Sequence, residues 1–171
     1  GMKMKINGEQ NAEADNYYVE YVAGDDAQGY WKETVAEGKD TTLDNSKMPW
    51  KLVSNADGTF TFTQNDWDGR AVGDDISSPD PSFVGKKIND VFFHRNRLGV
   101  ISDENVILSR SGAYFKFYAE TVTTILDTDP IDVSVSHTKV SILRHAIPFN
   151  ETLLLFSDQT QFMLNAGDSL T

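Results

Sequence analysis

The chain has 171 residues, 39% of them hydrophobic and 11% aromatic, which suits a folded domain and is too apolar for a disordered chain. Its 26 acidic and 15 basic residues give a formal net charge of −11, which argues against a surface that grips nucleic-acid phosphates through Lys and Arg. The absence of cysteine excludes disulfides, thiol catalysis and zinc ribbons. No apolar run reaches the roughly 18 residues of a membrane-spanning helix, so no membrane insertion is expected.

The first half of the chain is predicted to form a small antiparallel sheet. Aromatic, β-branched and alternating residues predict four strands there, over 17–22, 30–35, 50–53 and 59–63. Asp57-Gly58, between the last two, is a strong hairpin signal. The alternation of Thr and Phe places Phe60 and Phe62 on one face, which we expect to be half-buried.

A second meander of shorter, more apolar strands is predicted over 91–93, 97–101, 106–109, 114–118, 153–156 and 161–164. Turns about every eight residues suit a propeller blade, a barrel or a sandwich sheet. The helical spacing of Val140, Leu143 and Arg144 predicts one short helix over 137–147, which Pro148 ends.

Turn glycines and large apolar side chains are expected to hold these hairpins. Gly58 and Gly112 should adopt turn conformations that residues with a Cβ atom resist. We expect the core to be built around seven side chains: Phe60, Phe92, Leu98, Ile107, Leu143, Leu154 and Phe162.

These patterns predict a mainly β fold of antiparallel β meanders, with a small N-terminal β domain, partial β-propeller-like blades and one short helix. The first 90 residues hold 17 acidic against 9 basic side chains, whereas the rest of the chain holds 9 against 6. This shift falls near the Pro- and Ser-bearing stretch 74–81, which is typical of a loop. We therefore expect an acidic β domain over 1–76, a linker loop over 77–90 and a β meander over 91–171.

Both ends of the sequence favour a segment of a longer protein. Gly1 before Met2 resembles the scar left by tag removal. The last predicted hairpin is followed by a turn over 165–168 and no further strand. If the sheets are propeller blades, we expect the last blade to be only half present.

Motifs that would carry chemistry are missing. There is no Gly-x-Ser-x-Gly nucleophile elbow and no phosphate-binding Gly-x-Gly-x-x-Gly. Three histidines lack metal-ligand spacing: His94, His137 and His145. We therefore predict no catalytic, cofactor-binding or metal-binding residues, no cofactor and no enzyme activity.

The densest acidic group of the second half is Asp127, Asp129 and Asp132. Pro130 and the lack of a glycine break the calcium-loop pattern there. Turn or cap roles are therefore favoured over a cation site.

Aromatic residues of the first half leave a second function open. Seven could stack on sugars or on a partner, although strand spacing is more typical of a core: Tyr17, Tyr18, Tyr21, Tyr30, Trp31, Trp50 and Trp67. Among 26 acidic residues some pair will lie close enough for glycoside cleavage. A glycan-binding or glycan-cleaving module is therefore the alternative to a purely structural part.

Many short blocks of the sequence follow one another in an order that resembles a known family. The later blocks are FFHRNRLGVISDENVILSRSGAYFKF (92–117), DTDPIDVSVS (127–136) and SILRHAIPFNETLLLFSD (141–158). The earlier ones are YYVEYVA (17–23), YWKETVA (30–36), MPWKLV (48–53), DGTFTF (57–62), WDGRAVGDD (67–75) and PSFVGKKINDVFF (81–93). Over about residues 15–165 the chain resembles an internal piece of the nozzle protein, or tail tubular protein B, of short-tailed bacteriophages.

This resemblance implies a structural part of a virion. Nozzle proteins form a ring of six subunits around β-propeller-like domains at the end of the short tail. The ring continues the channel of the adaptor, tail tubular protein A, and neighbours the tail fibres. The resemblance therefore implies a homo-oligomer, made in the bacterial cytoplasm, through which DNA passes during ejection and which engages the host surface.

The acidic excess has two interpretations within such a channel. Carboxylates on the channel wall would repel the duplex, so that it slides instead of binding. Alternatively, the acidic residues only keep a virion protein soluble.

Overall fold

The computed structural model describes residues 1–9, 12–24, 28–136 and 140–165. Its strands in chain order are β1 (Lys3–Ile6), β2 (Tyr17–Ala23), β3 (Gly29–Thr34), β4 (Trp50–Ser54), β5 (Phe60–Gln64), β6 (Asp90–His94), β7 (Arg97–Ser102), β8 (Asn105–Leu108), β9 (Ile131–Ser134), β10 (Leu143–Phe149), β11 (Thr152–Ser157) and β12 (Gln161–Asn165). The helical structure described is one 3-10 turn, η1 (Glu13–Asp15), and no described helix is long enough to cross a membrane.

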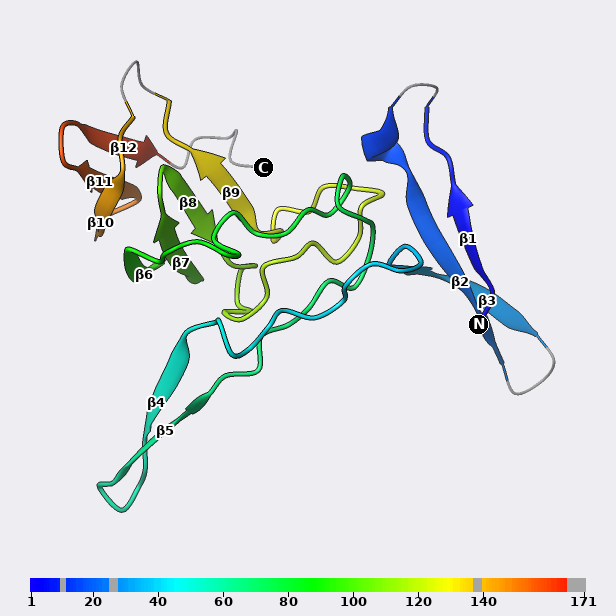
Figure 1. The fold of residues 1–171 in the computed structure, drawn as a ribbon, viewed down its shortest axis with the longest axis horizontal. Helices are drawn as coiled ribbons and strands as arrows, with labels where there is room; N and C mark the ends of the chain where they lie inside the picture. Colours follow the sequence, from blue (N-terminus) through cyan, green and yellow to red (C-terminus); the bar gives the residue numbers. More distant parts are fainter. Residues whose placement is uncertain (10–11, 25–27, 137–139, 166–171) are drawn as a thin grey trace.

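The mainly antiparallel β fold is confirmed. The strands form four sheets, with the orders β1-β2-β3, β4-β5, β6-β7-β8-β9 and β10-β11-β12. Figure 1 shows three parts: β1–β3 on one side, the β4–β5 hairpin projecting alone, and β6–β12 together. All four strands predicted for the first half are present, whereas β1 and β9 were not predicted.

Strand β7 is the structural centre because both of its faces are covered. Every residue of β7 is buried. Leu98 and Val100 point to one face of the strand and pack in a first apolar cluster, cluster A. Ile101 points to the other face and packs in a second apolar cluster, cluster B; the members of both are given in the next paragraph. Gly99 is required for this packing, since a Cβ atom there would lie 2.2 Å from the ring of Phe92 on β6.

The two clusters are formed by different segments of the chain. Cluster A joins β7 and β8 to the loops of the chain and comprises Leu43, Met48, Phe83, Leu98, Val100, Ile107, Phe117 and Tyr118. Cluster B lies between the β6–β9 and β10–β12 sheets and comprises Phe92, Ile101, Val106, Leu108, Leu143, Ala146, Leu153 and Leu155. Neither cluster contains a residue of β1–β5.

The predicted helix over 137–147 is wrong. Residues 137–139 lie outside the described part, and Leu143–Phe149 form strand β10, paired with β11. Leu143 and Ala146 gain burial in cluster B, because a β-bulge between Leu143 and His145 changes which side chains face inward. Pro148 is tolerated because β10 is the edge strand of its sheet.

The predicted strand over 114–118 is also wrong. The segment forms tight turns, with the Lys116 amide donating to the Ala113 carbonyl at 3.2 Å. Its rings pack one by one: Phe115 lies edge-on to Trp67 at 5.4 Å between centroids, and Phe117 edge-on to Phe83 at 5.0 Å. The alternating aromatic residues of this segment therefore make separate ring contacts: Phe117 belongs to cluster A, and Phe115 packs on Trp67 beside that cluster.

Four of the seven predicted core residues are buried: Phe92, Leu98, Ile107 and Leu143. Phe162 is partly buried against cluster B. Phe60 is 65% exposed, so that prediction is wrong, because no second layer covers its face of the hairpin within the described residues. Leu154 is half-buried, and its neighbours Leu153 and Leu155 face the core instead.

The turn glycines behave as expected, with φ of +81° at Gly58 and +74° at Gly112. The stretch 74–81 forms turns and no strand. Leu43 and Met48, from the first half, pack in cluster A with residues of the second half. The division into domains over 1–76 and 91–171 stays a prediction.

The two faces of β11 give a direct test of the core. We expect Leu155→Ala to lower the free energy of unfolding by about 2–5 kcal/mol, because it leaves a cavity in cluster B. Leu154→Ala, one residue away on the half-buried face, should cost less than half as much. Urea unfolding of both variants measures the difference, and equal losses would contradict the assigned faces.

Candidate functional site

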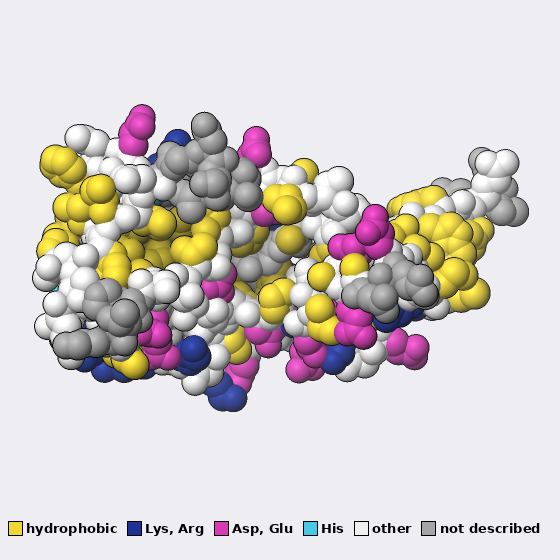
Figure 2. All heavy atoms as spheres, turned by 90° about the horizontal axis from the view of Figure 1, so that it is seen from above, with side chains coloured by type: hydrophobic (Ala, Val, Ile, Leu, Met, Phe, Trp, Pro, Cys, Tyr) yellow, Lys and Arg dark blue, Asp and Glu magenta, His cyan; other side chains and the backbone are white. Residues whose placement is uncertain are grey.

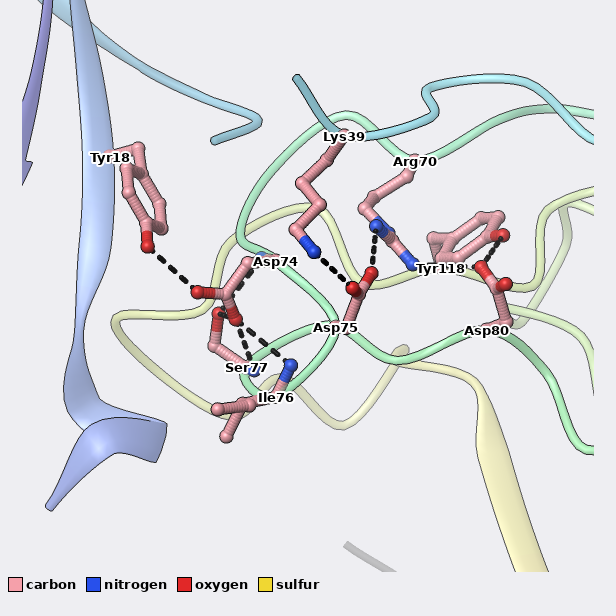
Figure 3. Close-up of polar contacts among 9 residues, drawn as sticks. All are labelled: Tyr18, Lys39, Arg70, Asp74, Asp75, Ile76, Ser77, Asp80 and Tyr118. Atoms are coloured by element: carbon pink, nitrogen blue, oxygen red, sulfur yellow. Dashed lines mark hydrogen bonds and ion pairs between the residues drawn. The ribbon is translucent and has the colours of Figure 1, made fainter. Parts of the chain in front are cut away.

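A buried arginine lies at the meeting point of the loops. The Arg70 side chain, between β5 and β6, is only 2% exposed. Its Nη1 lies 2.9 Å from Oδ1 of Asp75, and its Nη2 lies 2.7 Å from Oδ1 of Asp80. The guanidinium carbon is 5.5 Å from the ring centroid of Tyr118, whose hydroxyl donates to the same Asp80 oxygen at 2.7 Å (Figure 3). These four residues are called the Arg70 junction below.

The local sequence explains how the acids reach Arg70. Asp74 closes a tight turn, because its Oδ1 accepts hydrogen bonds from the amides of Ile76 at 2.9 Å and Ser77 at 3.0 Å. This turn directs the following residue, Asp75, toward Arg70, while Lys39 pairs with the other oxygen of Asp75 (Figure 3). One carboxylate thus joins cations from two separate loops.

Two groups of the junction, Tyr118 and Asp75, have pKa values shifted away from neutral pH. Burial and the hydrogen bond to Asp80 raise the pKa of Tyr118 well above its usual value. Hydrogen bonds from Lys39 and Arg70 lower the pKa of Asp75. A general acid or base needs a pKa near the working pH, which neither group has. The arrangement is suited to holding loops together.

Polar contacts beside the junction attach the β1–β3 sheet. The Tyr18 hydroxyl on β2 donates to Oδ2 of Asp74 at 2.8 Å. Burial and this hydrogen bond raise the pKa of Tyr18 to about 12. Burial alone would raise the pKa of Asp74, but the hydrogen bonds from Ser77, Ile76 and Tyr18 outweigh it and lower the pKa to about 2.

A second anchor of the sheet comes from Glu33 on β3. Its carboxylate accepts hydrogen bonds from the Val122 amide at 2.8 Å and the Thr121 hydroxyl at 2.6 Å. The Ala36 amide donates to the Gly73 carbonyl at 2.9 Å. These hydrogen bonds, together with the buried Val35 and Ala36 directly after β3, attach the sheet to the loops.

A second buried arginine, Arg97 on β7, is held by backbone oxygens. Its Nη1 donates to the carbonyls of Ser109 at 2.8 Å and Asp129 at 2.6 Å, and its Nη2 to that of Asp127 at 2.8 Å. Burial lowers the pKa of Arg97. The guanidinium thus satisfies carbonyls that the loop before β9 would otherwise leave unpaired.

Two side chains of the acidic group around Asp129 accept hydrogen bonds from backbone amides. Oδ2 of Asp129 accepts from the Leu126 amide at 2.8 Å within a turn, and Oδ2 of Asp132 accepts from the Ser82 amide at 2.7 Å. In the part of the chain that the structure describes, no three His, Asp or Glu side chains gather as possible metal ligands.

The two described histidines have different environments. His94 on β6 is buried, and burial lowers its pKa. His145 on β10 is exposed, with its Nδ1 3.6 Å from Oδ2 of Asp90. His137 lies outside the described residues. The prediction that no residue is catalytic or binds a cofactor stays a prediction.

Strand spacing favoured a core position for the seven aromatic residues of the first half. That expectation is wrong for the four that are exposed: Tyr21, Tyr30, Trp31 and Trp50. Tyr17 and Tyr18 are half-buried. Trp67 packs against cluster A as expected, and its Nε1 donates to the Pro49 carbonyl at 3.3 Å.

Sequence reasoning missed the Arg70 junction. One signal was present, since Arg70 is the only arginine among the first 90 residues and an acidic loop follows it. The partner ring of Tyr118, 48 positions later, could not be assigned, because the segment around it resembled a strand.

Removing the buried cation should destabilise the whole chain. We expect Arg70→Met to lower the free energy of unfolding by about 1–2 kcal/mol, because it removes two ion pairs and the cation beside the Tyr118 ring, while water still screens Asp75 and Asp80, whose side chains are each 57% exposed. Arg144→Met is the matched control: Arg144 also pairs with an aspartate, Asp158, but both side chains are exposed, so little change is expected. Equal losses in urea unfolding would contradict a structural role for the junction.

Comparison with known proteins assigns the chain to a family. A family model described as bacteriophage nozzle protein matches residues 1–171, the whole chain. The chain is also 46% identical over its full 171 residues to the tail tubular protein gp12 of Escherichia phage T7. It spans only 21% of that relative's length. This 171-residue chain belongs to the bacteriophage nozzle protein family.

Proposed function

We propose that the chain is a structural segment of a phage tail, located in the virion, that helps to form a conduit past which DNA moves without being held. The observation that carries the proposal is that many of its basic side chains are either paired with carboxylates or buried. Within the described residues, eight basic side chains are paired with carboxylates or buried, and over the whole sequence acidic residues outnumber basic ones by 26 to 15. The family membership gives this electrostatic pattern its context.

In the part of the chain that the structure describes, seven basic residues form ion pairs with carboxylates: Lys39, Lys47, Arg70, Lys86, Arg110, Lys116 and Arg144. Arg97 is buried among backbone carbonyls. Affinity for a duplex comes from cations that replace its counterions, so a paired or buried cation contributes little. The net charge of −11 then repels the duplex.

The assembly that fits this role is a ring of six copies that adjoins the adaptor and the tail fibres and lets DNA leave during engagement of the host surface. Its support is the family membership and the resemblance of the sequence blocks. The chain corresponds to about a fifth of its relative, so the remaining contacts of such a ring involve other parts of the longer protein.

A glycan-binding or glycan-cleaving role has less support. Tyr21 and Trp31 form an exposed edge-to-face pair across β2 and β3, but the carboxylate of Glu33, on the same face of β3 as Trp31, is engaged by Val122 and Thr121. A cavity of about 380 Å³ lies between the segments 43–48 and 83–88, and no Trp or Tyr lines it. A sugar site needs an aromatic platform beside paired carboxylates. We therefore propose that the segment is not an enzyme.

Duplex binding tests the proposal directly. In an electrophoretic mobility assay at low salt, we expect the chain to leave duplex DNA unshifted at about 10 µM, where ordinary non-specific binders form complexes. An oligolysine peptide run in the same gel shows that the assay can detect binding, because its free cations replace the counterions of the duplex. Binding by the unaltered chain that weakens steeply with salt would contradict the proposed role.

A further inference from the structure

The cavity between the segments 43–48 and 83–88 differs from the other exposed apolar parts of the chain, because it is concave. Figure 2 shows apolar side chains gathered on the projecting β1–β3 sheet, where Met4, Tyr21 and Trp31 are exposed. That face is open, so it touches a partner from one side only. The cavity holds about 380 Å³, which is within the size range of small-ligand sites. It is therefore large enough to enclose a small molecule.

The inner wall of the cavity is apolar and belongs to the core. Leu43, Met48 and Phe83 line it, and as members of cluster A each is no more than 8% exposed. Ile88, which packs against the same cluster, completes this wall. The flexible thioether of Met48 adapts to the shape of what lies against it. An apolar group placed on this wall leaves water while the core stays in place.

Tight turns hold both sides of the cavity. In the first segment the Lys47 amide donates to the Asp44 carbonyl at 2.9 Å, and in the second the Lys86 amide donates to the Phe83 carbonyl at 3.0 Å. Gly85 in the second turn has φ of +73° and borders open space, since a Cβ atom there would meet nothing within 4 Å. The site is therefore pre-formed and open at its mouth.

The mouth of the cavity carries more positive than negative charge, unlike the chain as a whole. Lys47 and Lys86 line it from opposite segments, and Asp44 is the carboxylate among the described residues that line it. Asp44 is already engaged: its Oδ1 accepts from the Ser46 hydroxyl at 2.6 Å, and its Oδ2 lies 3.0 Å from Nζ of Lys47. The charge at the mouth therefore favours an anionic ligand over a cationic one.

Lys86 is the cation that is most available to such a ligand. Its Nζ lies 3.4 Å from Oδ2 of Asp103, and the two side chains are 46% and 47% exposed. Exposed pairs of this kind contribute little, because water screens them. An ammonium group has three N–H donors, so Lys86 can donate to a ligand carboxylate at the mouth.

We propose that this cavity binds a small hydrophobic carboxylate. The apolar part of the ligand lies against Leu43, Met48 and Phe83, and its carboxylate lies at Lys86. A free aliphatic or aromatic acid has this chemistry, and so does the end of a peptide whose last side chain is apolar. Such a site is separate from the repulsion of DNA and goes beyond it.

Amide NMR of the 171-residue chain, titrated with phenylbutyrate, tests the proposal, because the shifted amides locate the ligand. We expect saturable shifts in the segments 43–48 and 83–88, with a Kd at or below about 1 mM, the range for a ligand of this size. Phenylbutanol, which has the same apolar part and no charge, should bind about threefold more weakly or less tightly still.

Two neighbouring lysines provide the matched variants. Lys86→Gln should weaken phenylbutyrate binding by about threefold or more and leave phenylbutanol binding unchanged. Lys87→Gln is the control, because Lys87 is also exposed but does not line the cavity, and it should change binding less than about twofold. Both variants lie at exposed positions and should keep the amide spectrum of the fold.

Four results would overturn the proposal: no shift in the two segments up to about 10 mM ligand, shifts confined to β1–β5, equal binding of the acid and the alcohol, or equal losses in the two lysine variants. An acetylated tripeptide that ends in phenylalanine distinguishes the two sources of the ligand. Tighter binding of the peptide than of phenylbutyrate supports the end of a peptide chain, and the reverse supports a free acid. None of these results depends on the DNA-binding assay.

Discussion

The burial of β7 on both faces is the constraint on which the rest of the structure depends. Leu98 and Val100 hold the loops of cluster A, and Ile101 holds the β10–β12 sheet through cluster B. The close approach of Gly99 to Phe92 allows this strand to lie between two layers. Because β1–β5 contribute nothing to either cluster, their stability must come from elsewhere.

The Arg70 junction supplies that second source of order. Its guanidinium joins the acidic loop to Tyr118, which is itself part of cluster A. Asp74, in the same loop, binds Tyr18 of the β1–β3 sheet. The N-terminal sheet is thus connected to the apolar core through a short series of polar contacts. Such contacts fix an orientation at a lower net gain in stability than apolar packing gives.

Local patterns predicted most strands but not their environment. The Thr and Phe alternation of β5 correctly indicated a two-faced strand, yet alternation cannot tell whether a second layer covers either face, so Phe60 was misplaced. The run from Leu153 to Phe156 has no alternation, which left its inward face undetermined. The spacing around Leu143 suits a short helix as well as a bulged strand, and pairing with β11 decided between them. The Arg70 junction depends on contacts up to 48 residues apart, which no local pattern contains.

Together these features describe a stable centre that carries two weakly supported apolar arms, which suits one segment of an assembly. Amide hydrogen exchange of the isolated chain, resolved by residue, tests this account most directly. It predicts that β7 and β8 amides exchange only through global unfolding, whereas β1–β3 and β4–β5 amides exchange much faster, through local opening. Equal protection across all four sheets would contradict it.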